Sequence, residues 1–115
     1  MSAHGPGRRA RARINTSSSG NTTLVAAATD GAFYEIDFIQ IMPSGGANTV
    51  QLRDGSTTVV FSYPLDDNQA QTFDNASGDY PIVLSSNTAM VLNLSAATQV
   101  DGFVLYRVVG GADGM

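Results

Sequence analysis

The sequence of 115 residues contains no cysteine, no tryptophan, no lysine and only one histidine, His4. Without cysteine the fold uses no disulfide, and thiol catalysis and cysteine-based zinc sites are excluded. One histidine in a leader rich in glycine and arginine cannot form a histidine-based catalytic pair or a histidine-rich metal site. We therefore expect a protein that is not an enzyme and that binds no cofactor and no metal.

The carboxylates and serines do not form a recognisable catalytic or metal-binding motif. Asp66 and Asp67 are adjacent, and paired acids can hydrolyse glycosides or hold calcium. However, the chain has no Asp-x-Asp-x-Asp-Gly loop, and aspartate is typical of turns. No Gly-x-Ser-x-Gly elbow is present, and the paired glycines lack the lysine of a phosphate-binding loop. The sequence favours turns at these positions.

The length and hydropathy of the chain indicate one globular domain. A chain of this size buries roughly two-thirds of its unfolded surface, and an apolar fraction of 43% is ordinary for such a domain. No apolar run approaches the ~20 residues of a membrane span. The N-terminal arginines precede no apolar signal region, so we expect neither membrane association nor a cleaved secretion signal.

Positive charge is concentrated near the N-terminus. Four of the six arginines are Arg8, Arg9, Arg11 and Arg13; from residue 14 on, two arginines accompany all ten acidic residues, a formal net charge of −8. Because residues 1–13 have no apolar periodicity, they predict a flexible basic arm. Guanidinium groups bind phosphates or carboxylates. We favour carboxylates of a protein partner, since an acidic body repels nucleic acid; a solvated tail without a role is the alternative.

Short runs of β-branched and aromatic residues recur about every ten residues, with turn residues between them. This spacing predicts seven or eight short antiparallel strands, and no window shows the 3.6-residue apolar period of a helix. Asp54-Gly55 gives the strongest hairpin signal. We therefore predict an all-β domain over residues 14–110, either a β-sandwich, jelly-roll variants included, or a small barrel, followed by a polar C-terminal tail over residues 111–115.

The predicted strand over residues 33–42 has an irregular alternation. Tyr34, Ile36 and Phe38 share one face, whereas Ile39 and Ile41 fall on the other. Since strict alternation buries one face only, the strand either has a bulge near residues 38–39 or has both faces covered. We favour the second, with the first three residues in the core and the others against a neighbouring subunit.

Several other apolar residues exceed the needs of one core, and a small domain with few charges then exposes an apolar patch. Self-association into a symmetric oligomer is the simplest outcome. The predicted oligomer interface consists of Phe33, Ile39, Ile41, Val104, Tyr106 and Val108.

Residues 14–27 read INTSSSGNTTLVAA, and residues 92–106 read LNLSAATQVDGFVLY. Both segments resemble small β-sandwich structural proteins of tailed bacteriophages, the head decoration (cement) proteins and head or tail accessories. The resemblance covers residues 14–109. It implies a jelly-roll-like sandwich, a homotrimer, and a place on the outer capsid surface between subunits of the major capsid protein.

The leading expectation is a structural virion protein that decorates and stabilises a phage capsid by binding the major capsid protein as a homo-oligomer. The capsid-binding residues are then Arg8, Arg9, Arg11 and Arg13. The alternative is a carbohydrate- or receptor-binding module of a phage tail fibre, although the lack of tryptophan disfavours a stacking platform for sugars. A third possibility, a nucleic-acid-binding arm, predicts strongly salt-sensitive binding.

Overall fold

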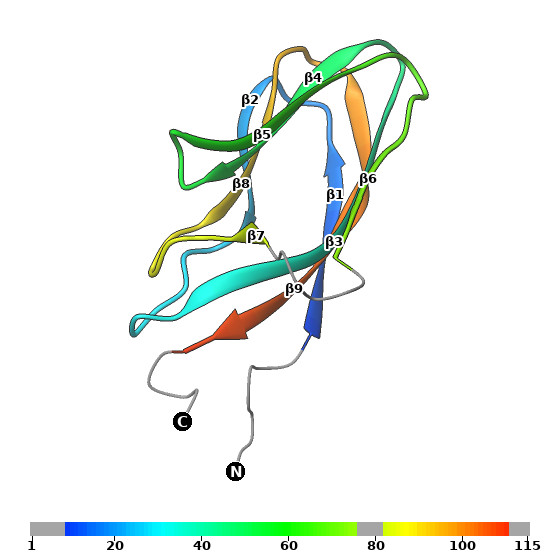
Figure 1. Cartoon of the computed structure of the whole chain (residues 1–115). Helices are drawn as coiled ribbons and strands as arrows, with labels where there is room; N and C mark the ends of the chain where they lie inside the picture. Colours follow the sequence, from blue (N-terminus) through cyan, green and yellow to red (C-terminus); the bar gives the residue numbers. More distant parts are fainter. Residues whose placement is uncertain (1–8, 76–81, 111–115) are drawn as a thin grey trace.

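The computed structural model describes residues 9–75 and 82–110, and the regular structure in these ranges consists entirely of β-strands. The strands form two antiparallel sheets that pack face to face as a sandwich (Figure 1). The predicted all-β sandwich is confirmed. Arg8 and the predicted tail over residues 111–115 lie outside the described residues. No helix in the described ranges is long and apolar enough to cross a membrane.

The chain alternates between the two sheets. In order, the first sheet contains β1 (Arg9–Thr16), β9 (Gln99–Val109), β3 (Phe33–Ser44) and β6 (Gln71–Asp74), and β7 (Ile82–Val83) also pairs with β3. The second sheet contains β2 (Gly20–Val25), β8 (Met90–Leu94), β4 (Asn48–Asp54) and β5 (Thr58–Leu65). Every connection except β4–β5 and β6–β7 crosses from one sheet to the other, which is the pattern of a jelly roll.

The described residues contain nine strands, compared with the predicted seven or eight. The additional strand is β1, which the arginine-rich segment forms; β6 and β7 divide one edge of the first sheet between them. The predicted Asp54-Gly55 hairpin is confirmed, because Asp54 pairs with Thr58 across the turn between β4 and β5.

Two prolines lie inside strands, and the first of them directly follows the strand predicted over residues 33–42. Pro43 pairs with Val100 in β9, and Pro64 pairs with Thr49 in β4. β6 pairs with β3 only as far as Ile41, so none of the described strands pairs with the other side of β3 at Pro43. Proline lacks an N–H donor and is tolerated where that side of the strand has no ladder.

β3 contains a β-bulge at Asp37, where its register with β9 shifts between Ile36 and Phe38. The extra residue reverses the parity of the strand, so that Ile39 and Ile41 face the same core as the apolar residues before the bulge. The predicted two-faced strand is therefore a one-faced strand with a bulge. Phe38, which we expected in the core, lies on the outer face of the sheet and is half-buried.

Three of the predicted interface residues belong to this core. Ile39 and Ile41 are each 1% exposed in the single chain, and Val104 is 0% exposed. A side chain without accessible surface cannot contact another subunit, so the interface assignment is wrong for these three residues. The sequence shows which residues share a face, but only strand pairing determines which face is the inner one.

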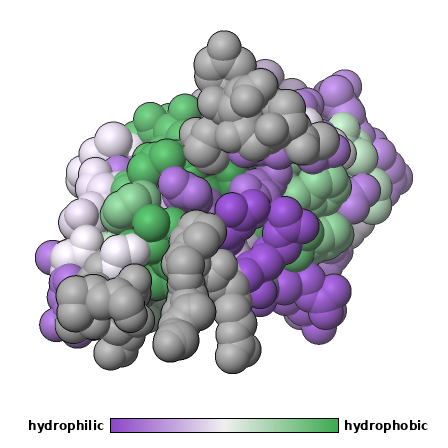
Figure 2. All heavy atoms as spheres, turned by 60° about the horizontal axis from the view of Figure 1, so that its bottom comes forward, coloured by the Kyte–Doolittle hydropathy of each residue, from purple (hydrophilic) through white to green (hydrophobic). Residues whose placement is uncertain are grey.

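The other three predicted interface residues lie closer to the surface. Tyr106 packs against the core and meets Tyr34 edge to face, with ring centroids 5.3 Å apart. Phe33 is half-buried, and Val108 is 42% exposed. Phe33 and Val108 lie where β3 begins and β9 ends. Figure 2 looks onto this end of the sandwich and shows apolar surface (green) beside polar surface (purple).

The second sheet supplies the other half of the core. Its most buried apolar side chains are Val50, Leu52, Met90, Leu92 and Leu94, all 2% exposed or less. Along β4 they alternate with polar residues, as expected for a sheet with one face toward solvent, whereas in β8 the residue between Met90 and Leu92 is Val91, which is itself buried. Burial of each such side chain contributes about 1.5–3 kcal/mol, so this inner layer supplies much of the stability.

Candidate interaction surface

The acidic and histidine side chains of the described residues do not cluster as metal ligands. Among these described side chains, no group of three is placed to hold a metal ion. An open hollow of about 220 Å³ lies beside Asn48, Pro64 and Asp66. The side-chain amide of Asn48 is already used there, since Nδ2 donates to the carbonyl of Ala96 at 2.9 Å and Oδ1 accepts from the N–H of Ser95 at 3.0 Å.

The arginine segment predicted to be a flexible arm is an ordered strand over residues 9–13. Within β1, every residue from Arg9 to Thr16 pairs with β9 without a shift in register. Its side chains alternate: the arginines are exposed, whereas Ala12 is 8% and Ile14 is 1% exposed. For residues 9–13 the prediction of an arm is wrong, because alanines form the inward face and residues this small give a weak apolar signal; residues 1–8 lie outside the described residues.

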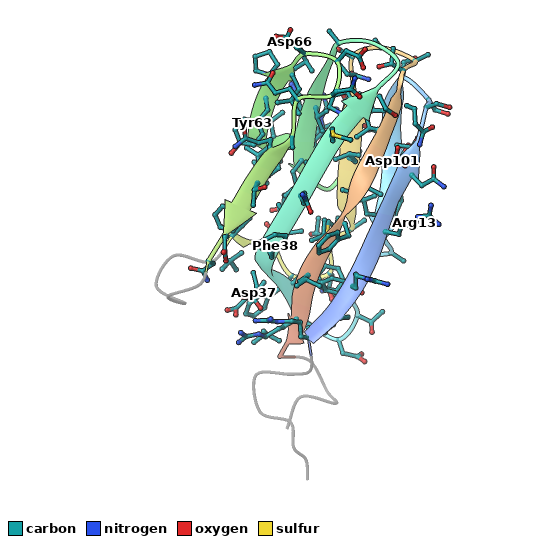
Figure 3. All side chains as sticks on the ribbon, turned by 90° about the vertical axis from the view of Figure 1, so that its right-hand side faces the viewer. Arg13, Asp37, Phe38, Tyr63, Asp66 and Asp101 are labelled. Carbon is teal, nitrogen blue, oxygen red and sulfur yellow. The ribbon has the colours of Figure 1, made fainter. Side chains whose placement is uncertain are left out.

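Arg9 is paired within the chain. Its Nε lies 3.4 Å from Oδ2 of Asp37, and Nε of Arg107 lies 3.0 Å from the same oxygen. The Asp37 side chain is only 7% exposed, while those of Arg9 and Arg107 are 54% and 32% exposed. A buried carboxylate with two guanidinium groups fastens the start of β1 to β3 and β9. Figure 3 shows Asp37 near the lower end of this sheet.

Sequence reasoning missed this ion-pair group. Its members come from three strands, and Asp37 is 28 residues from Arg9 and 70 residues from Arg107 along the chain. A weak signal did exist, because Asp37 is an acid next to the change of parity in β3. Since Arg9 already has a carboxylate partner, it is less available to a capsid than predicted.

Arg11 and Arg13 are both exposed on the outer face of the first sheet. They stand opposite Leu105 and Phe103 of β9, respectively. Within residues 9–75 and 82–110, neither forms an ion pair. Arg13 extends from β1 in Figure 3. Two cations that have no ion-pair partner among the described residues of an acidic protein are suited to an acidic partner.

Beside these arginines lies an apolar stripe, which consists of Phe38, Met42, Phe103 and Leu105. All four side chains are half-buried on the outer face of β3 and β9. The rings of Phe38 and Phe103 stack with their centroids 5.5 Å apart and an interplanar angle of 22°. Figure 3 shows Phe38 on this face. Solvent-facing aromatic rings next to cations are typical of a protein interface.

The outer face of the second sheet differs, because its arginine is bound within the chain. Arg53 donates to Oε1 of Gln51 at 2.8 Å through Nη2, and through Nη1 to Oδ1 of Asn21 at 3.2 Å and to the carbonyl of Ser56 at 3.0 Å. Asn93 donates to the same Asn21 oxygen at 2.8 Å. This face is a closed polar network, so the first sheet is the stronger candidate for binding.

Comparisons with known proteins support the fold. No protein-family model matches the chain, and no curated protein matches it by sequence. The chain is similar in structure to a chain from the acid-stable capsid of Helicobacter pylori bacteriophage KHP30, with a TM-score of 0.57 and 20% identity over 88% of this chain and 90% of that one. It is also similar to a chain of the disulfide-linked pili of Bacillus endospore appendages, with a TM-score of 0.54 and 13% identity over 97% and 98% of the two chains.

Proposed function

We propose that this protein is a structural component of a bacteriophage virion that decorates and stabilises the capsid by binding the major capsid protein on its outer surface. The observation that carries the proposal is the jelly-roll sandwich, which the chain shares almost end to end with a chain of a phage capsid. The two segments that resemble phage decoration proteins also lie together, since they span β1–β2 and β8–β9, and these strands pair.

The capsid contact is assigned to Arg11 and Arg13. Arg9 lies beside them and contributes less, because it is already ion-paired with Asp37. Arg8 belongs to the same proposed set but lies outside the described residues. Each arginine contributes a modest contact to an acidic surface. A homo-oligomer presents several copies of the set at once, so that its dissociation from the lattice is slow.

The subunit contact of this oligomer, proposed to be a trimer, is assigned to the apolar stripe, with Phe33 and Val108 near one end of the sandwich. Burial of the Phe38–Phe103 pair supplies the apolar core that a stable subunit interface needs. This assignment replaces Ile39, Ile41 and Val104, which the fold already buries.

The test is co-sedimentation with capsids assembled from the major capsid protein of the same phage. We expect the wild-type chain to saturate the capsids and the Arg11→Gln/Arg13→Gln variant to lose at least tenfold in affinity. Arg53→Gln is the matched control, because it removes the same charge from the opposite sheet. No capsid binding by the wild-type chain contradicts the proposal; binding to a glycan array in its place supports the tail-fibre alternative.

A further inference from the structure

We propose that the free edge of β1 binds an extended strand of a partner protein in which acidic and apolar side chains alternate. The partner strand continues the first sheet beyond β1. This inference gives the chemistry of the capsid contact and depends on the proposed function only for the identity of the partner.

Of the sheet edges formed by the described strands, β1 is the one suited to strand addition. β5 contains Pro64 and a bulge at Val60, both of which obstruct pairing along an edge. β2 has six residues and a shift in register at Leu24. β6 and β7 have four and two residues. β1 has eight residues, contains neither proline nor glycine, and keeps an unbroken register with β9.

The side chains of β1 determine what the added strand must contain. On the outer face, Arg11 and Arg13 have no acid opposite them, because their cross-strand neighbours are Leu105 and Phe103. Directly opposed side chains on an added strand lie about 4.5–5.5 Å away, within reach of an ion pair. On the inner face, Ala10 and Ala12 are apolar and belong to the side of the sheet that covers the core, so the facing positions of an added strand suit apolar residues. The complementary strand therefore alternates acidic and apolar residues.

A second copy of this chain does not provide such a strand. Pairing two β1 edges places arginines beside arginines, which is repulsive. Acids two positions apart occur once in the sequence, at Glu35 and Asp37. Both lie in β3, which pairs with β9 on one side and with β7 on the other. The added strand consequently comes from another protein.

The probe is a synthetic nine-residue peptide that alternates valine and glutamate, titrated against the full chain by fluorescence anisotropy. Two further peptides carry N-methyl groups, one on all valine amides and the other on all glutamate amides. In a strand, these two sets of N–H groups point to opposite sides. We expect one methylated peptide to bind as well as the parent and the other to lose about tenfold or more in affinity, because its backbone donors are blocked.

The variants of the protein test the side-chain part of the inference. Arg11→Gln/Arg13→Gln should weaken binding of the parent peptide and reduce its salt dependence, whereas Arg53→Gln should leave both unchanged. Replacement of every glutamate in the peptide by lysine should abolish binding. Equal binding of the two methylated peptides, or loss of binding by both, overturns strand addition.

The two proposals fail separately. If capsids bind the protein but the peptides give no methylation-dependent difference, the strand inference is wrong and the virion function stands. If the peptides behave as expected but capsids do not bind, the virion function is wrong and the edge remains a binding site. Protection of β1 amides from hydrogen exchange that rises with protein concentration, without peptide, means that a second copy occupies the edge and also overturns the inference.

Discussion

At the scale of single residues, Asp37 has two effects on the molecule. As the extra residue of the bulge, it turns Ile39 and Ile41 toward the core. Its carboxylate forms ion pairs with Arg9 and Arg107 on the outer face. Without the bulge, the strand would alternate regularly. Ile39 and Ile41 would then face solvent when Tyr34 and Ile36 face the core, because a shift of one residue reverses every side chain.

Ile39→Asp should unfold the protein. The side chain is 1% exposed, and a buried carboxylate without a partner costs about 4 kcal/mol or more, a large part of the stability of a domain this size. Gln40→Asp is the control, because Gln40 is exposed on the same strand and should retain most of its stability. Circular dichroism during thermal unfolding measures both. A folded but dissociated Ile39→Asp variant would restore Ile39 to the subunit interface.

Tyr34 should make the fold sensitive to alkaline pH. Burial raises the pKa of Tyr34 above its usual value of 10.0, and the nearby Tyr106 raises it further. The folded state therefore holds this proton more tightly than the unfolded state. The resulting stability is fully present below about pH 10 and is lost as the pH rises from there through the raised pKa.

The composition makes this effect measurable, because no lysine or cysteine side chain titrates in the same range. Tyr34→Phe should show a smaller loss of stability between pH 9 and pH 11 in urea unfolding. It should also lose about 1 kcal/mol at neutral pH, since the hydroxyl of Tyr34 donates to the carbonyl of Ala26. Tyr63→Phe, at a half-buried position of β5, is the comparison. An unchanged alkaline slope in Tyr34→Phe contradicts the assignment.

At the scale of elements, the close approach of β9 to β3 depends on Gly102. A Cβ atom at this position would lie 1.8 Å from the carbonyl oxygen of Gln40. Gly102→Ala should therefore force apart the central strands of the first sheet and cost more than about 3 kcal/mol in urea unfolding. Gly45→Ala is the matched control, because Gly45 also has a positive φ but no atom within 4 Å of its Cβ position, and it should cost about 1–2 kcal/mol. Equal losses in the two variants would mean that β9 can move away from β3.

The same scale shows what the sequence could and could not predict. The Asp54-Gly55 hairpin was predictable because turn chemistry is local. β1 was not, because its inward face consists largely of alanine. The bulge in β3 was one of two alternatives that the sequence left open, and the other was favoured, because only pairing with β9 determines which face is the inner one. The ion pairs of Asp37 with Arg9 and Arg107 join strands that are far apart in the sequence, so no local pattern predicts them.

At the scale of the whole molecule, the two outer faces have different characters. The second sheet carries the closed network of Arg53, Gln51, Asn21 and Asn93. The first sheet carries the apolar stripe and the arginines of β1. A chain without lysine has few of the usual edge-protecting side chains, and here Pro64 and the bulge at Val60 protect the edge at β5. One side of the sandwich is thus suited to solvent and the other to partners.

The oligomer should depend on the apolar stripe. We expect the wild-type chain to sediment as an oligomer, proposed to be a trimer, at micromolar concentration. Phe38→Ser/Phe103→Ser should be monomeric while still folded. The two rings stack on the outer face, so their loss removes an interface; it costs folding about 1 kcal/mol for the stacking and roughly 1 kcal/mol more for the buried area of each half-buried ring.

Val59→Ser/Val60→Ser is the matched control for that variant. It also removes two apolar side chains, which are 45% and 36% exposed, but from the edge strand of the second sheet. Light scattering gives the mass of each protein, and thermal unfolding shows that each is folded. Both variants reduce the exposed apolar area, so if the oligomer depended on non-specific hydrophobic association, both would dissociate. Dissociation of the phenylalanine variant alone assigns the contact to the first sheet, whereas an unchanged mass in that variant, or a monomeric wild-type chain, shows that the stripe does not join subunits.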